Sequence, residues 1–83
     1  MSYDEIVVRL RNAFPDAEEV KVVGEGNKID VTVVSAVFSG LRPVQKQQKI
    51  YACLNDLIAS GELHAVSMRT LTPEEWQRTR MFG

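Results

Sequence analysis

The sequence predicts an α+β protein in two layers, with the element order α-β-β-α-β-α and the helices on one face of a three-stranded mixed sheet. Apolar residues recur at helical spacing near the start, in the middle and near the end of the chain. Three short runs alternate apolar and polar residues, which is typical of half-buried strands. Three strands this short offer too little surface for helices on both faces. A chain of 83 residues, 45% of them apolar, fits one domain over 1–83.

The first half of the chain predicts a helix and a hairpin. The pattern Ser2-x-x-Glu5 is a capping box, and Pro15 ends the run that follows it. The apolar residues of this helix are Tyr3, Ile6, Val7, Leu10 and Phe14. The runs 20–22 and 29–33 then alternate as strands, and the Gly-rich segment 24–28 between them predicts a hairpin turn that pairs them antiparallel.

The second half predicts a long helix, a strand and a short helix. The long helix covers 43–60, with Pro43 in its first turn and Gly61 as its C′ residue. Helical spacing predicts a buried arc of Val44, Gln47, Ile50, Tyr51, Leu54, Leu57 and Ile58, and places Lys46, Lys49 and Cys53 on the opposite side. The run 63–68 alternates as a third strand. Thr72-Pro73-Glu74-Glu75 combines an N-cap, a proline at the first helical position and a capping-box glutamate.

Composition excludes several classes of protein. Ten basic against eleven acidic residues give a net charge of −1, so the whole-surface basic footprint of many nucleic-acid-binding proteins is absent. The longest run without a charge is 31–41, which is too short to span a bilayer of ~30 Å. Cys53 is the single cysteine and cannot form an internal disulfide. We therefore expect a soluble cytoplasmic protein with no membrane partner.

The chemistry-bearing residues are few. Cys53 and His64 are compatible with a nucleophile–base dyad, but no recognisable pattern supplies an oxyanion hole or a residue that orients the base, so we expect no enzyme. From its position at the start of a strand, His64 is either a half-buried structural residue or a metal ligand whose companions come from another chain.

Three cations near the start of the long helix allow a second interpretation. Arg42, Lys46 and Lys49 form a basic stripe that is either a nucleic-acid contact or a solvated helix face. Cys53 lies near Lys49 on the helical projection, which would lower the pKa of an exposed thiol. The alternative for Cys53 is a small apolar residue in a packing contact.

Several motifs together resemble one family. Phe38-Ser39-Gly40, His64-Ala65-Val66-Ser67 and Thr72-Pro73-Glu74-Glu75-Trp76, with the intervening Gln47-Gln48-Lys49-Ile50-Tyr51, resemble the BolA family over nearly the whole chain. The resemblance implies a class II KH-like fold of the element order predicted above. It also implies a non-enzymatic role in iron homeostasis and stress responses, in which the protein pairs with a monothiol glutaredoxin.

In such a pair the resemblance implies a bridging [2Fe-2S] cluster that the isolated chain does not bind. The glutaredoxin cysteine and glutathione ligate one side, and the histidine of the His-Ala-Val-Ser motif, here His64, ligates the other. Imidazole replaces thiolate in some clusters of this type. Many family members carry a second histidine or cysteine between the first two strands, whereas 24–28 has neither. The second ligand is therefore open among Cys53, water and a second partner thiol, and we expect a more labile cluster.

The KH resemblance also bears on nucleic acids. KH domains clamp the backbone with a Gly-x-x-Gly loop. Here Gly40-Leu41-Arg42-Pro43 has proline at the second glycine position, which disfavours RNA clamping. Some family members act as DNA-binding transcriptional regulators, so Arg42, Lys46 and Lys49 keep DNA as an alternative partner.

Overall fold

The computed structural model describes residues 2–82, so the two end positions of the expected domain 1–83 lie outside the described residues. The order of elements is α-β-β-α-β-α as predicted, with one short 3₁₀ turn, η1, that the sequence did not indicate. The elements are α1 (Tyr3–Ala13), β1 (Glu19–Glu25), β2 (Lys28–Val34), η1 (Ala36–Phe38), α2 (Pro43–Ala59), β3 (Ala65–Leu71) and α3 (Pro73–Phe82).

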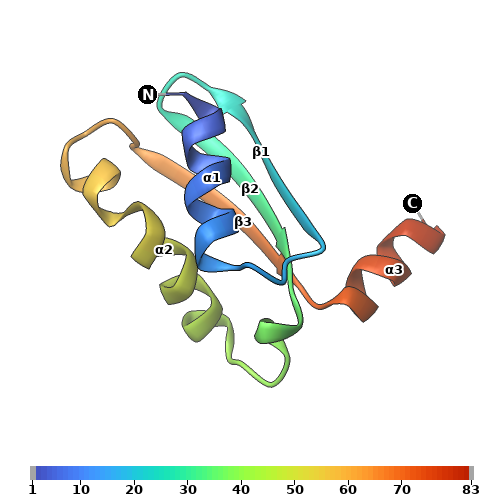
Figure 1. Cartoon of the computed structure of the whole chain (residues 1–83). Helices are drawn as coiled ribbons and strands as arrows, with labels where there is room; N and C mark the ends of the chain where they lie inside the picture. Colours follow the sequence, from blue (N-terminus) through green and yellow to red (C-terminus); the bar gives the residue numbers. More distant parts are fainter. Residues whose placement is uncertain (1, 83) are drawn as a thin grey trace.

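The three strands form one mixed sheet in the order β1-β2-β3. β1 and β2 are antiparallel, with Val22 opposite Val31, and β2 and β3 are parallel, with Val31 opposite Met68. Figure 1 shows α1 and α2 side by side over one face of this sheet, which confirms the predicted two-layer α+β class. α3 continues beyond the end of β3, away from α1 and α2, because only Thr72 separates the strand from the helix.

The core lies between the sheet and the two covering helices. On β2 the alternate residues Ile29, Val31 and Val33 are buried, while Lys28 and Asp30 face away from the helices. Five buried side chains of α1 and α2 belong to the same core cluster as these residues of β2. They are Ile6 and Leu10 of α1 and Ile50, Leu54 and Leu57 of α2. The rings of Phe14 and Phe38, 5.4 Å apart, close the end of the core near η1.

The buried arc of α2 differs from the prediction. Ile50, Leu54 and Leu57 are buried, but Val44 is 54% exposed, and Tyr51 and Ile58 are each more than a third exposed. Gln47, which was also predicted in this arc, is exposed. The half-buried Cys53 and Lys46, by contrast, were predicted on the opposite side. The arc is turned toward Cys53 because α1 packs against that flank of the helix, and helical spacing alone does not reveal on which flank a neighbouring helix lies.

The predicted caps are present at both terminal helices. The backbone N–H of Glu5 donates to Ser2 Oγ (3.2 Å). At α3 the capping box is complete, because Thr72 N–H donates to Glu75 Oε1 (2.8 Å) and Glu75 N–H donates to Thr72 Oγ1 (3.3 Å). None of the helices in the described part of the chain is long and apolar enough to cross a membrane.

Candidate metal-ligand site at His64

His64 lies in the connection between α2 and β3, one residue before the strand begins. The predicted strand start at 63 is therefore two residues early. α2 ends at Ala59, and Gly61 follows its C-cap with a φ of +84°, which is accessible to glycine without steric penalty. Leu63 follows, with its N–H donating to Leu57 O (3.1 Å) and its side chain fully buried. This anchor holds His64 at the surface, where the residue is exposed.

The turn between β1 and β2 faces His64. The backbone carbonyl of Asn27 accepts the N–H of His64 (2.9 Å) and that of Ala65 (3.4 Å). The side-chain amide nitrogen of Asn27 lies 3.1 Å from His64 Nδ1. Because one residue contacts both the backbone and the ring of His64, the imidazole is held against the turn.

The same turn is attached to α1. The hydroxyl of Tyr3 donates to the carbonyl oxygen of Gly26 at 3.2 Å. Gly26 has a φ of +59°, as the tight hairpin turn requires. Three segments that are distant in sequence, the start of α1, the β1–β2 turn and the end of α2, thus meet around His64.

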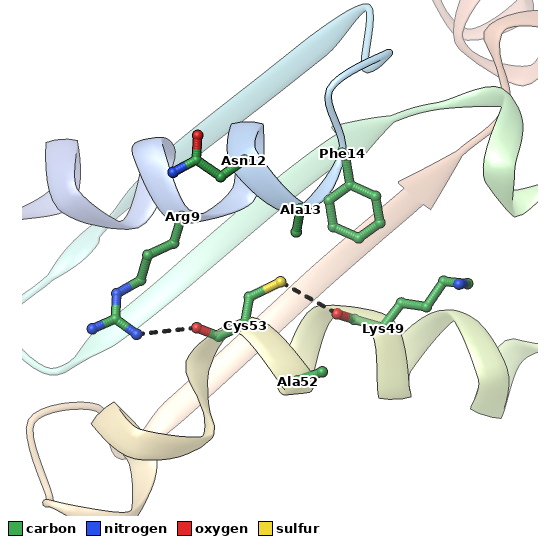
Figure 2. Close-up of a pocket in the computed structure, with 7 residues that line it drawn as sticks. All are labelled: Arg9, Asn12, Ala13, Phe14, Lys49, Ala52 and Cys53. Carbon is green, nitrogen blue, oxygen red and sulfur yellow. Dashed lines mark hydrogen bonds between the residues drawn. The ribbon is translucent and has the colours of Figure 1, made fainter.

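Cys53 lies in a different environment. Its Sγ–H donates to Lys49 O (3.4 Å), and its carbonyl accepts from Arg9 Nη1 (3.2 Å), so the residue faces α1 (Figure 2). Burial raises the pKa of the Cys53 thiol, and the charge of Arg9 opposes this effect only partly. A lowered thiol pKa was expected only for an exposed Cys53, and the residue is half-buried, so the alternative of a packing residue fits. The structure pairs His64 with Asn27, and Cys53 with Arg9.

A groove of about 540 Å³ runs between α1 and α2 at Cys53. Its lining residues are Arg9, Asn12, Ala13, Phe14, Lys49, Ala52 and Cys53 (Figure 2). Arg9 is bound beside the groove by two hydrogen bonds to the carboxylate of Asp56, at 2.7 and 2.9 Å. This pair raises the pKa of Arg9 and lowers the pKa of Asp56, mainly through the side-chain hydrogen bonds.

The three cations of the predicted basic stripe have different neighbours. Arg42 is the N-cap residue of α2, and its N–H donates to Gln45 Oε1 (2.9 Å). Lys46 is half-buried, and its charge contributes to the lowered pKa of Glu75, whose main cause is the hydrogen bond from the Thr72 backbone. Lys49 lines the groove.

The sequence and the fold are similar to those of known proteins. The family model described as "BolA-like protein" matches residues 11–75, which include η1, all three strands and His64. The chain belongs to the BolA family. It is 49% identical over 83 residues to a protein of the rpoN-murA intergenic region of Acinetobacter guillouiae, covering all of this chain and 99% of the relative.

Other BolA-family proteins are similar to this chain over most of its length. The chain is a homologue of the acid stress protein IbaG of Escherichia coli K12, at 41% identity over 80 residues that cover 96% of this chain and 94% of IbaG. A BolA-like protein from Babesia bovis has the same fold with a TM-score of 0.80 at 24% identity, over 96% of this chain and 94% of the other. The solved relative supports the KH-like α+β fold predicted from the sequence.

Two features of this BolA-family chain could not be found from sequence patterns. Asn27 and His64 are 37 positions apart, and Arg9 and Asp56 are 47 apart. The only local signal was the helical spacing of Glu5 and Arg9, whose charged groups lie 3.8 Å apart. Within residues 2–82 no three or more histidine, cysteine, aspartate or glutamate side chains form a group that could hold a metal ion.

Proposed function

We propose that this BolA-family protein is a non-enzymatic iron–sulfur accessory protein that pairs with a monothiol glutaredoxin and shares a bridging [2Fe-2S] cluster, for cluster trafficking or iron sensing in the cytoplasm. The observation that carries the proposal is the exposed imidazole of His64. It stands on a buried anchor, Leu63, and is held by Asn27. An exposed and oriented imidazole is suited to complete a site on another protein.

The donor chemistry of the chain agrees with a shared cluster. Histidine ligates [2Fe-2S] centres in Rieske proteins, so His64 is a suitable ligand. The chain has one histidine and one cysteine, whereas a [2Fe-2S] cluster takes four ligands. We assign the remaining ligands to the glutaredoxin cysteine, glutathione and a water or second thiol of the partner.

Cys53 is the weaker choice for a second ligand. Its thiol donates to Lys49 O within α2, and its carbonyl contacts α1, whereas the ring of His64 contacts the β1–β2 turn. The raised pKa of the thiol also disfavours the thiolate that iron requires. The proposal therefore uses His64 as the only ligand from this chain.

Co-expression with a monothiol glutaredoxin tests the assignment. The wild-type pair should purify as a coloured complex, and His64→Ala should change its visible circular dichroism. Cys53→Ser is the matched control, because it alters the other soft donor of the chain, and its spectrum should equal that of the wild type. An unchanged spectrum in His64→Ala would remove His64 from the ligand set, and a changed one in Cys53→Ser would restore Cys53 to it.

DNA binding is the second candidate function. A Haemophilus influenzae relative named "DNA-binding transcriptional regulator BolA" is 37% identical over 54 residues, 65% of this chain and 52% of that protein. Arg42 and Lys49 are exposed and available for phosphate contacts, while Lys46 is half-buried.

Salt dependence separates specific use of these residues from background binding. If Lys46 and Lys49 contact phosphates, changing both to Glu should weaken DNA binding and reduce the slope of log K against log salt by about 2. Lys21→Glu with Arg69→Glu makes the same change in charge on the sheet face away from α1 and α2, and should have the smaller effect. Equal effects of the two double variants would indicate non-specific attraction only.

A further inference from the structure

Asn27 occupies the turn in which a second ligand was expected, yet its side chain contacts the ring of His64. The amide nitrogen of Asn27 and Nδ1 of His64 are 3.1 Å apart, which is hydrogen-bonding distance. The Asn27 carbonyl also accepts the N–H groups of His64 and Ala65. The backbone bonds fix the position of the amide relative to the ring, so the contact is part of the fold of the turn.

The contact between Asn27 and His64 affects which ring nitrogen can ligate a metal. A neutral imidazole carries its proton on one nitrogen and a lone pair on the other, and only the lone pair can ligate a metal. Metal-ligating histidines commonly donate their second N–H to an oxygen, which fixes the tautomer. Rotation of an asparagine amide by 180° exchanges its N–H₂ donor for its carbonyl oxygen at nearly the same place. With its amide turned so that the oxygen faces the ring, Asn27 can therefore accept a hydrogen bond from Nδ1–H without moving its backbone.

The other nitrogen, Nε2, has open space on the side of α2. Gly61 lies on that side, and a Cβ added to it would meet Nε2 at 3.7 Å. The absence of a side chain at Gly61 keeps this nitrogen free of a covering group. Nδ1 is thus occupied by the turn, and Nε2 is the nitrogen that an approaching partner can reach.

We infer that Asn27 is a positioning residue, whose side-chain oxygen accepts Nδ1–H of His64 and so presents the lone pair of Nε2 as the ligating atom. The inference rests on the proposed function, because only a ligating His64 needs its lone pair on Nε2; with the amide nitrogen toward Nδ1, the ring would carry its proton on Nε2 instead. In this chain the β1–β2 turn orients the ligand that the connection between α2 and β3 provides, and the turn itself provides no histidine or cysteine.

The tautomer of the isolated chain tests the inference without any glutaredoxin. Long-range ¹H–¹⁵N NMR of the His64 ring at about pH 8.5, where an ordinary histidine is neutral, should show mainly the Nδ1–H form in the wild type. Asn27→Ala should shift the ring toward the Nε2–H form, which unconstrained histidine favours in water. Asn27→Asp keeps an acceptor and should retain the Nδ1–H form.

Lys28→Ala is the matched control, because it truncates the next residue of the same segment and should leave the tautomer ratio at the wild-type value. Backbone amide spectra of each variant report whether the turn is still folded, and Asn27→Asp tests the inference even if Asn27→Ala unfolds. A wild-type ring mainly in the Nε2–H form, or equal ratios in wild type and Asn27→Ala, would overturn it.

The complex provides a second readout. With glutaredoxin bound, the cluster should be lost about tenfold faster from Asn27→Ala than from wild type, in line with the effect of removing such hydrogen bonds at other metal sites. Asn27→Asp should restore the lifetime. A confirmed tautomer with no cluster in any variant would refute the proposed function and leave the role of Asn27 intact. A wild-type lifetime in Asn27→Ala would refute that role.

Discussion

Truncating Leu63 should unfold this protein more easily than any change at the neighbouring surface. The side chain of Leu63 is fully buried in the core, and Leu63→Ala removes three of its carbon atoms. At about 0.8 kcal/mol for each buried carbon group, the lost transfer free energy is roughly 2.4 kcal/mol. The cavity left behind adds to this, so the free energy of unfolding should fall by about 3–4 kcal/mol.

Such a loss is large for a chain of this size. A domain of 60–100 residues loses about 4–8 °C of melting temperature per kcal/mol, so Leu63→Ala should melt roughly 15–25 °C below the wild type. Urea unfolding followed by far-ultraviolet circular dichroism measures the free energy directly, and an unchanged m value would show that the same surface is still exposed on unfolding. The control is Val8→Ala on α1, where the valine is 57% exposed, and its effect should stay within about 0.5 kcal/mol.

A small effect of Leu63→Ala on the free energy of unfolding would contradict the role of Leu63 as an anchor. If Leu63→Ala lowers the free energy of unfolding by less than about 1 kcal/mol, Leu63 does not anchor the connection between α2 and β3. His64 would then lose its structural support, because its position depends on Leu63 and on the Asn27 carbonyl. Hydrogen exchange at the amides of His64 and Ala65 gives an independent check, since both should exchange faster in the variant if the anchor is real.

Three further experiments test other parts of the structure. Asp56 has a lowered pKa because Arg9 binds its carboxylate, so it stabilises the fold above its unfolded pKa of about 3.9 and this stability is lost as the pH falls through the folded value. Wild type should therefore lose more stability than Asp56→Asn between about pH 7 and pH 3 in urea unfolding, and equal losses would contradict the pairing. Cys53 should react with iodoacetamide more slowly than free cysteine near neutral pH, because burial raises its pKa, and faster alkylation would show the opposite environment. Gly24→Ala should destabilise the hairpin by about 1–3 kcal/mol, because the new Cβ would collide with the carbonyl oxygen of Lys28; a melting temperature equal to that of wild type would show that the strands can move apart.

Local signals in the sequence predicted much of the fold. The N-cap at Ser2, the capping box at Thr72, the turn at Gly26 and the C′ glycine at Gly61 all have the predicted roles. These features succeed because their physics involves residues within four positions of one another. The alternation along β2 correctly predicted Ile29, Val31 and Val33 as buried, because a strand buried on one face has a period of two, but it did not indicate that Val34 is buried as well.

Features that depend on distant neighbours could not be predicted in the same way. Helical spacing predicted the centre of the buried face of α2 but not the flank that α1 covers, so Val44 is exposed and Cys53 is half-buried, the reverse of the prediction. The position of α3 beyond the sheet was not predicted from the one-residue connection between β3 and α3. At the site, the sequence indicated His64, but its contact with Asn27 exists only because the hairpin and the end of α2 meet in the folded chain.

The site and the core share one short segment, which separates the two ways in which His64 can fail. Leu63 faces the core and His64 faces outward, so a change at Leu63 acts on stability first and on the ligand only through the backbone. A change at the Asn27 side chain leaves both backbone bonds to its carbonyl and acts on the ring alone. If Leu63→Ala destabilises the protein while the tautomer of the folded fraction is unchanged, and Asn27→Ala does the reverse, then anchoring and orientation of the ligand are independent tasks. A variant at either position that produced both effects would show that the ring and the core are coupled through the connection between α2 and β3.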